Sequence, residues 1–164
     1  MPSAILDYGC GFGMNIPYLQ EYFPCSNIFG CDISEESISL AKKSIKGCTF
    51  NTIKKAEDLN IYKDNIDCVF ISTVLHHIPY NEHEKWIGAL YEILKKGGHL
   101  IIFEHNMINP HTKSFVEKIS MDKDATMLNM KYCKKILKNI FGNESAVKLG
   151  YTYFSRGGID YSHG

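Results

Sequence analysis

A glycine-rich turn constrains the fold of this chain more than any other feature of its sequence. Glycine occupies every second position from Gly9 to Gly13, directly after the strand-like residues 3–7 and before the helix-like residues 15–23. Glycines spaced in this way let a backbone turn tightly and approach a ligand without Cβ clashes. The turn therefore predicts a ligand-binding loop between a strand and a helix, with a plain surface turn as the alternative.

The spacing of these glycines disfavours two common phosphate-binding loops. A dinucleotide fingerprint, G-x-G-x-x-G, would need its third glycine where Met14 stands, and Gly13 comes one residue early. The loop also lacks the lysine and hydroxyl residue of a P-loop. An NAD-dependent oxidoreductase is therefore disfavoured.

Short apolar runs alternate with amphipathic segments along the chain. The strand-like runs are residues 3–7, Asn27–Asp32, 49–53, Ile66–Ser72 and 99–104. The segments between them mostly have apolar residues at the three-to-four spacing of helices. This alternation predicts an α/β fold, a doubly wound and mostly parallel sheet with helices on both faces. Such sheets bind ligands at the carboxyl ends of their strands.

Capping residues mark the expected helices after the first. Ser34 is suited to begin a helix that Gly47 ends, and Asn81 to begin one that Gly97 and Gly98 end. A third helix is expected over Met130–Phe141, with its lysines on a face that we interpret as solvated. Residues 145–154 and 159–161 are the last strand candidates.

Polar residues stand where three of the predicted strands end. Asp32 ends the second strand, where an acid can accept both hydroxyls of a ribose, although a helix cap or a solvated strand end is the alternative. His76 and His77 follow the fourth strand, and an imidazole there can remove a proton from a substrate or merely pack beneath the loop. Glu104 and His105 end the fifth strand and are candidates for a substrate wall or an ordinary polar strand end. The predicted catalytic residues are His77, His76, Glu104 and His105.

Composition excludes several classes of protein. Eighteen basic and eighteen acidic residues give a net charge of zero, which argues against a protein built mainly to bind nucleic acid. No apolar run approaches the ~20 residues of a membrane span. The six cysteines contain no CxxC pair, so we expect reduced thiols in a cytoplasmic protein rather than disulfides. No histidine or acid spacing suggests a metal site, and none is predicted.

These motifs together resemble the class I S-adenosylmethionine-dependent methyltransferases. The resemblance rests on D-x-G-x-G-x-G after the first strand, the acid that ends the second, and the stretch LKKGGHLIIFE. The segments AEDL and LHHI narrow it to methyltransferases that act on small molecules. It covers about residues 3–106.

The resemblance implies a role for each matching residue in binding S-adenosylmethionine. The side chain of Asp7 and the glycine backbone would hold the methionine end, and the backbone at Ser72 would bound its amino group. The residues implied at this end are Asp7, Gly9, Cys10, Gly11, Gly13 and Ser72.

The adenosine end would lie along the next two strands. Asp32 would bind the ribose, Ile33 would pack on the adenine ring, and Ala56 with Glu57 would meet the adenine edge. In this family an acid often precedes the Ala-Glu pair, but here Lys55 stands there and a lysine cannot accept a hydrogen bond. Glu57 or its neighbour Asp58 would have to substitute.

We therefore expect a single methyltransferase domain over residues 1–164, apparently lacking the family's N-terminal helices and part of its C-terminal hairpin. It would transfer a methyl group to a small-molecule acceptor and release S-adenosylhomocysteine. A non-catalytic S-adenosylmethionine-binding module, or a degenerate or truncated enzyme, is the alternative. No nucleic-acid partner is expected, and a homodimer is left open.

Overall fold

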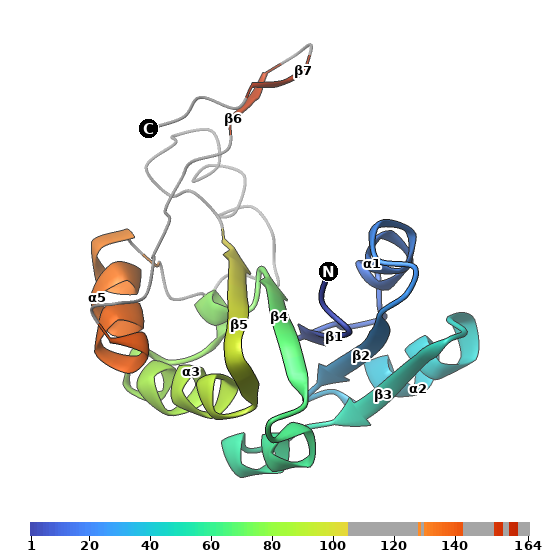
Figure 1. Cartoon of the computed structure of the whole chain (residues 1–164), viewed down its shortest axis with the longest axis horizontal. Coiled ribbons are helices and arrows are strands. Elements are labelled where there is room, and N and C mark those ends of the chain that lie inside the picture. The colour runs from blue at the N-terminus through green and yellow to red at the C-terminus, as the bar shows by residue number, and fades with distance from the viewer. Residues whose placement is uncertain (105–127, 129, 143–152, 156–157, 161–164) are drawn as a thin grey trace.

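The protein contains one sheet of five parallel strands (Figure 1). The computed structural model describes residues 1–104, 128, 130–142, 153–155 and 158–160. The strands of the sheet are β1 (Ala4–Tyr8), β2 (Asn27–Asp32), β3 (Cys48–Thr52), β4 (Ile66–Ser72) and β5 (Leu94–Phe103). Their order is β3-β2-β1-β4-β5, so the chain moves outward from β1 in one direction and then in the other. The predicted doubly wound fold is confirmed, and its switch point lies between β1 and β4.

Helices cover both faces of the sheet. Figure 1 shows α1 and α2 on one side and α3 and α5 on the other. The bounds are α1 (Ile16–Tyr22), α2 (Glu35–Ser44), the 3₁₀ helix η1 (Ala56–Tyr62), α3 (His83–Glu92) and α5 (Met130–Phe141). Successive side chains of a strand point to opposite faces. In β1, accordingly, Ile5 joins the apolar cluster beneath α1 and α2, and Leu6 joins the cluster beneath α3 and α5.

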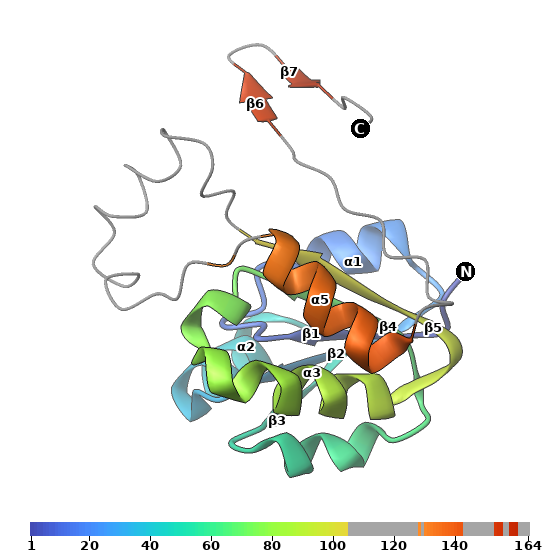
Figure 2. The same ribbon diagram turned by 90° about the vertical axis from the view of Figure 1, so that its left-hand side faces the viewer.

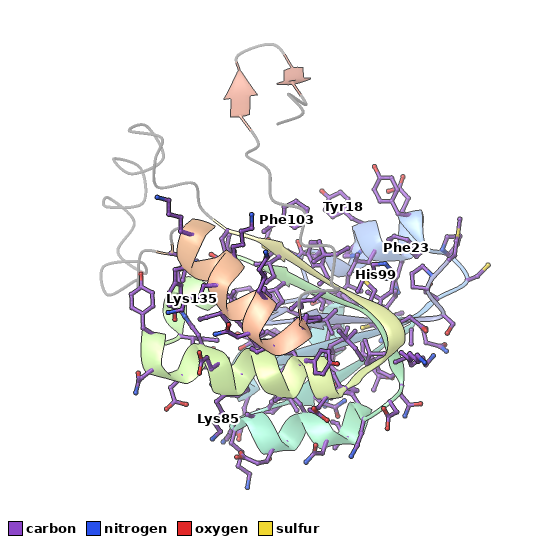
Figure 3. The ribbon with its side chains drawn as sticks, turned by 60° about the vertical axis from the view of Figure 1, so that its left-hand side comes forward. Tyr18, Phe23, Lys85, His99, Phe103 and Lys135 are labelled. Carbon is purple, nitrogen blue, oxygen red and sulfur yellow. The ribbon has the colours of Figure 1, made fainter. Side chains whose placement is uncertain are left out.

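The helix α5 has the predicted amphipathic pattern. Ile136 is buried in the apolar cluster that contains Leu6, whereas the four lysines of the helix are exposed. Figure 2 shows α5 lying along α3, and Figure 3 labels Lys135 on it. Among the described residues, no helix has the length and apolar character needed to cross a membrane.

The predicted end of the helix that Asn81 was expected to begin was wrong. A short 3₁₀ helix, η3 (Tyr80–Glu82), precedes α3, which already ends at Glu92, and Gly97 and Gly98 lie inside β5. The register between β4 and β5 shifts beside this glycine pair: Ile66 pairs with Leu94, whereas Cys68, only two residues later, pairs with His99. The extra residues form an irregularity in which Gly97 has a φ of +80°. The glycine pair therefore accommodates a bulge rather than ending a helix.

The remaining elements agree with the prediction to within a few residues or lie outside the described part. β6 (Tyr153–Ser155) and β7 (Gly158–Asp160) pair antiparallel, while residues 145–152, where the first of these strands was expected to begin, lie outside the described residues. His105 also lies outside them. All six cysteines are free, as expected; Cys10 and Cys31 are buried.

Candidate functional site

The glycine loop after β1 is held by backbone hydrogen bonds to the end of β2. The N–H groups of Gly9 and Cys10 both donate to the carbonyl oxygen of Cys31, at 2.8 and 2.9 Å. The N–H of Gly13 then donates to the carbonyl of Cys10 at 2.7 Å, which closes the turn that leads to α1. Burial raises the pKa of the Cys10 thiol, so this side chain is a neutral part of the loop frame.

The three glycines of the loop face different surroundings. All have positive φ: +72° at Gly9, +52° at Gly11 and +81° at Gly13. A Cβ on Gly9 would lie 2.3 Å from the Val74 side chain, and a Cβ on Gly13 would lie 2.4 Å from Ile45. Among the described residues, no atom lies within 4 Å of a Cβ on Gly11. Two glycines therefore permit packing within the protein, and Gly11 borders open space suited to a ligand.

Asp32 connects the end of β2 to this loop. Its Oδ2 accepts the N–H of Gly11 at 2.9 Å, and its Oδ1 accepts the N–H of Ser34 at 2.9 Å. The helix α2 is capped by Ser34, whose Oγ accepts the N–H of Ser37 at 3.1 Å, so Asp32 is not the cap. Each carboxylate oxygen can accept a second hydrogen bond. Ile33, beside it, is 67% exposed and offers an apolar surface to a ring.

Asp7 is a fully buried acid near the end of β1. The residue has no exposed surface, and neither of its carboxylate oxygens has a hydrogen-bond partner among the described residues. Burial raises its pKa, the nearby Asn15 side chain lowers it and the charge of Asp32 raises it, and together they place the pKa at about 7. A buried carboxylate at the end of β1 that lacks a partner is suited to a cationic group of a ligand.

The residues predicted at the adenine edge begin the 3₁₀ helix η1. Ala56 is buried, while Glu57 is exposed and forms an ion pair with Lys85 at 3.2 Å. Asp58 accepts the N–H groups of Lys54 and Lys55 through Oδ2, at 3.0 and 3.1 Å. Asp58 thus stabilises the start of η1 through Oδ2, and its Oδ1 is an acceptor three positions after Lys55.

The loop after β4, residues 73–78, carries the predicted histidines and is called here the post-β4 loop. Oε1 of Glu104 accepts the N–H groups of Val74 and Leu75, at 2.9 and 2.7 Å. Oε2 of Glu104 lies 2.7 Å from Nδ1 of His76, which is buried. His77 is exposed, and its ring centroid is 4.0 Å from that of His76. The structure thus brings His76, His77 and Glu104 together.

Sequence reasoning missed the contribution of His83, at the start of α3. This side chain is 1% exposed; its Nε2 lies 2.9 Å from the Leu75 carbonyl oxygen and its Nδ1 lies 3.0 Å from the Tyr132 hydroxyl. Its burial depends on α5, which follows much later in the chain, so the local pattern carried no signal for it. Among the described residues, no group of three or more His, Cys, Asp or Glu side chains is arranged to hold a metal ion.

Known proteins share sequence similarity with this chain. Residues 5–98, more than half of the chain, match the sequence family described as "Methyltransferase domain". The chain is also 30% identical over 115 residues to the tRNA N(3)-methylcytidine methyltransferase trm141 of Schizosaccharomyces pombe, covering 64% of this chain and 45% of that protein. The chain spans less than half the length of the curated relatives that it matches.

Solved structures share the fold. A SAM-dependent methyltransferase from Archaeoglobus fulgidus superposes with a TM-score of 0.70 at 19% identity, covering 84% of this chain and 59% of that one. Phosphoethanolamine N-methyltransferase 2 of Haemonchus contortus, in complex with S-adenosyl-L-methionine, gives a TM-score of 0.64 at 21% identity, covering 84% of this chain and 32% of that one.

Proposed function

The chain belongs to the methyltransferase-domain family, and from this premise we propose that it transfers a methyl group from S-adenosylmethionine to a small-molecule acceptor. The observation that carries the proposal is the open space beside Gly11, together with two acids from neighbouring strands: Asp7 of β1, whose buried carboxylate has no hydrogen-bond partner among the described residues, and Asp32, which ends β2 and accepts the Gly11 N–H. S-adenosylmethionine has an ammonium group for the first acid and ribose hydroxyls for the second. These residues therefore fit both ends of the cofactor.

Each predicted cofactor residue has a part in this proposal. Asp7 and the loop backbone hold the methionine end, with the end of β4 at Ser72 bounding its amino group. The remaining lone pairs of the Asp32 carboxylate accept the ribose hydroxyls, and the exposed Ile33 covers one side of the adenine ring. The proposed cofactor-binding set is Asp7, Gly9, Cys10, Gly11, Gly13, Asp32, Ile33, Ala56, Glu57 and Ser72.

Methyl transfer requires little chemical assistance from the protein, because the reactive methyl group comes from the cofactor. When bound, S-adenosylmethionine supplies a methyl carbon on a positively charged sulfur, which a nucleophile displaces in line, leaving S-adenosylhomocysteine. The protein must align the acceptor with this carbon and exclude water. A base is needed only when the acceptor arrives with a proton to lose. The exposed imidazole of His77 is our candidate base, because His76 directs its Nδ1 to Glu104.

Two findings bear on the class of acceptor. The net charge of zero favours a small molecule over a nucleic acid, and the phosphoethanolamine enzyme shows the fold acting on such a substrate. A relative that matches 64% of this chain is named as a tRNA methyltransferase, so RNA is the competing acceptor.

A non-catalytic cofactor-binding module is the second candidate function, and the basic side chain of Lys55 at the proposed adenine edge favours it.

The test combines binding with transfer. Calorimetric titrations with S-adenosylmethionine, S-adenosylhomocysteine and NAD are expected to show binding of the first two compounds alone. Incubation with methyl-labelled cofactor and either a metabolite extract or bulk tRNA is then expected to label the metabolite fraction. Label found in tRNA would overturn the small-molecule acceptor, cofactor binding without any labelled product would favour the binding module, and binding of NAD alone would overturn the cofactor.

A further inference from the structure

The post-β4 loop is fixed from two sides by residues that lie outside the cofactor loop. Glu104, directly after β5, binds the loop from one side, and His83, at the start of α3, binds it from the other. We propose that Glu104 and His83 are positioning residues: they clamp this loop against Gly9 and thereby set the affinity for the cofactor. The inference rests on the proposed cofactor site and assigns neither residue a contact with the cofactor.

The backbone of Leu75 shows the clamp most directly. Its N–H donates to Oε1 of Glu104 at 2.7 Å, and its carbonyl oxygen lies 2.9 Å from Nε2 of the buried His83. The N–H and the carbonyl group of Leu75 are thus both contacted by side chains from other elements, and the carbonyl also accepts the N–H of Ile78 at 3.0 Å. The Glu104 carboxylate also accepts the N–H of Val74 at 2.9 Å. Removing the carboxylate would leave two partly buried amide donors without partners, which is costly.

His83 is itself held in place by α5. Its Nδ1 lies 3.0 Å from the hydroxyl oxygen of Tyr132, and that oxygen lies 3.1 Å from the carbonyl oxygen of Tyr80. The ring of Tyr132 packs against both His83 and Tyr80, with centroid distances of 5.6 and 4.7 Å. The seating of α5 therefore orients the imidazole that holds Leu75.

The clamp reaches the cofactor loop through Val74. Its side chain fills the space where a Cβ on Gly9 would stand, so the post-β4 loop packs directly on the backbone of Gly9. Thr73, which opens the post-β4 loop, has a φ of +56°, an unfavourable backbone conformation for a β-branched residue. Such a conformation persists only where the surroundings impose it. Loss of the clamp is therefore expected to shift Val74 and release Gly9.

The test measures S-adenosylhomocysteine affinity by calorimetry, at a temperature where every variant is folded. Glu104→Ala is expected to weaken binding about 10–100-fold, the range expected for buried donors left unpaired. His83→Ala is expected to weaken binding to a smaller extent, because the Leu75 carbonyl keeps its hydrogen bond from the N–H of Ile78. Glu104→Gln keeps an oxygen for both amides and is expected to recover most of that loss. His99→Ala, on β5, is the histidine control, and Ile93→Val lowers stability at the buried residue directly before the same strand. Both controls are expected to bind normally.

A spectroscopic readout separates this clamp from the cofactor proposal. The amide resonances of Gly9 and Leu75 in the ligand-free protein are expected to move in Glu104→Ala and in His83→Ala but not in the controls. If the amides move while the native protein binds no S-adenosylhomocysteine, the cofactor proposal fails and the clamp remains. Normal affinity in both alanine variants would overturn the inference, as would an equal loss in Ile93→Val.

Discussion

Oδ2 of Asp32 accepts the backbone N–H of Gly11 at 2.9 Å, which joins the acid that ends β2 to the glycine loop that follows β1. The same carboxylate accepts the N–H of Ser34 through its other oxygen. Asp32 therefore shapes the loop before any ligand binds, and it still has two lone pairs with which to accept ribose hydroxyls. One side chain thus has both a structural and a binding part in the proposed site.

Substitution of Asp32 is expected to weaken cofactor binding. Asp32→Ala removes the acceptor for the ribose hydroxyls and leaves the Gly11 amide unpaired, which costs roughly 1–3 kcal/mol, or about 5–150-fold in affinity. Asp32→Asn keeps one acceptor oxygen and is expected to lose less. Calorimetry with S-adenosylhomocysteine measures both variants, with Glu36→Ala on the exposed side of α2 as the control. An unchanged dissociation constant for Asp32→Ala would remove this residue from the site.

Two glycines of the loop are expected to respond differently to the same substitution. Gly11→Val places a side chain in the open space proposed for the cofactor, so it should abolish binding while the domain still folds. Gly13→Val would overlap Ile45 within the protein and should lower the free energy of unfolding by about 1–3 kcal/mol more than Gly11→Val. Since both positions have positive φ, the backbone strain is common to the two variants. Full binding by a folded Gly11→Val protein would show that the loop is not the cofactor cradle.

The buried Asp7 is expected to make stability depend on pH. Its pKa is about 7 in the folded protein and near ~3.9 in an unfolded chain, so between these values the folded state holds the extra proton. The stabilisation is complete below about pH 4 and is lost as pH rises through 7. Asp7→Asn should therefore gain stability relative to the native protein at pH 8 compared with pH 5, as measured by urea unfolding. A stability difference that is the same at both pH values would contradict the assignment.

Cofactor binding is expected to reverse the protonation of Asp7. An ammonium group beside the carboxylate favours the charged form and lowers its pKa, so binding near pH 6.5 should release a proton. Calorimetric titrations with S-adenosylhomocysteine in two buffers of different ionisation enthalpy measure that proton. Asp7→Asn provides the control, since it has no proton to release. Identical proton release by the native protein and this variant would place the ammonium group elsewhere.

The sheet could be predicted from sequence because its signals are local. The run Ile66–Ser72 is nearly continuously apolar, as is typical of a strand inside a parallel sheet, and it forms the interior strand β4. The glycine pair Gly97 and Gly98 misled because such a pair ends helices and also permits bulges. Only the pairing of β4 with β5 distinguishes the two cases.

The candidate site was predictable in its positions but not in its bonds. Strand ends placed Asp32 and Glu104 at one edge of the sheet, since all five strands are parallel. The pattern did not show that Glu104 directs its carboxylate to the backbone of the post-β4 loop. His83 was overlooked because its burial requires Tyr132, which lies 49 positions later in the chain. Contacts of this kind arise from packing between helices and produce no periodic pattern in the sequence.

The last prediction concerns His77 as the base. If its exposed imidazole takes a proton from the acceptor, His77→Ala should slow turnover by about 10²–10⁴-fold and leave cofactor affinity nearly intact. Turnover by the native protein should then rise with pH across the range in which histidine loses its proton, about pH 5 to 8. The measurements are initial rates with an acceptor found by labelling, calorimetric affinity for S-adenosylhomocysteine, and thermal stability, with His99→Ala as the matched control. A rate independent of pH, together with a loss of affinity in His77→Ala as large as the loss of rate, would show that His77 only supports the loop beside His76.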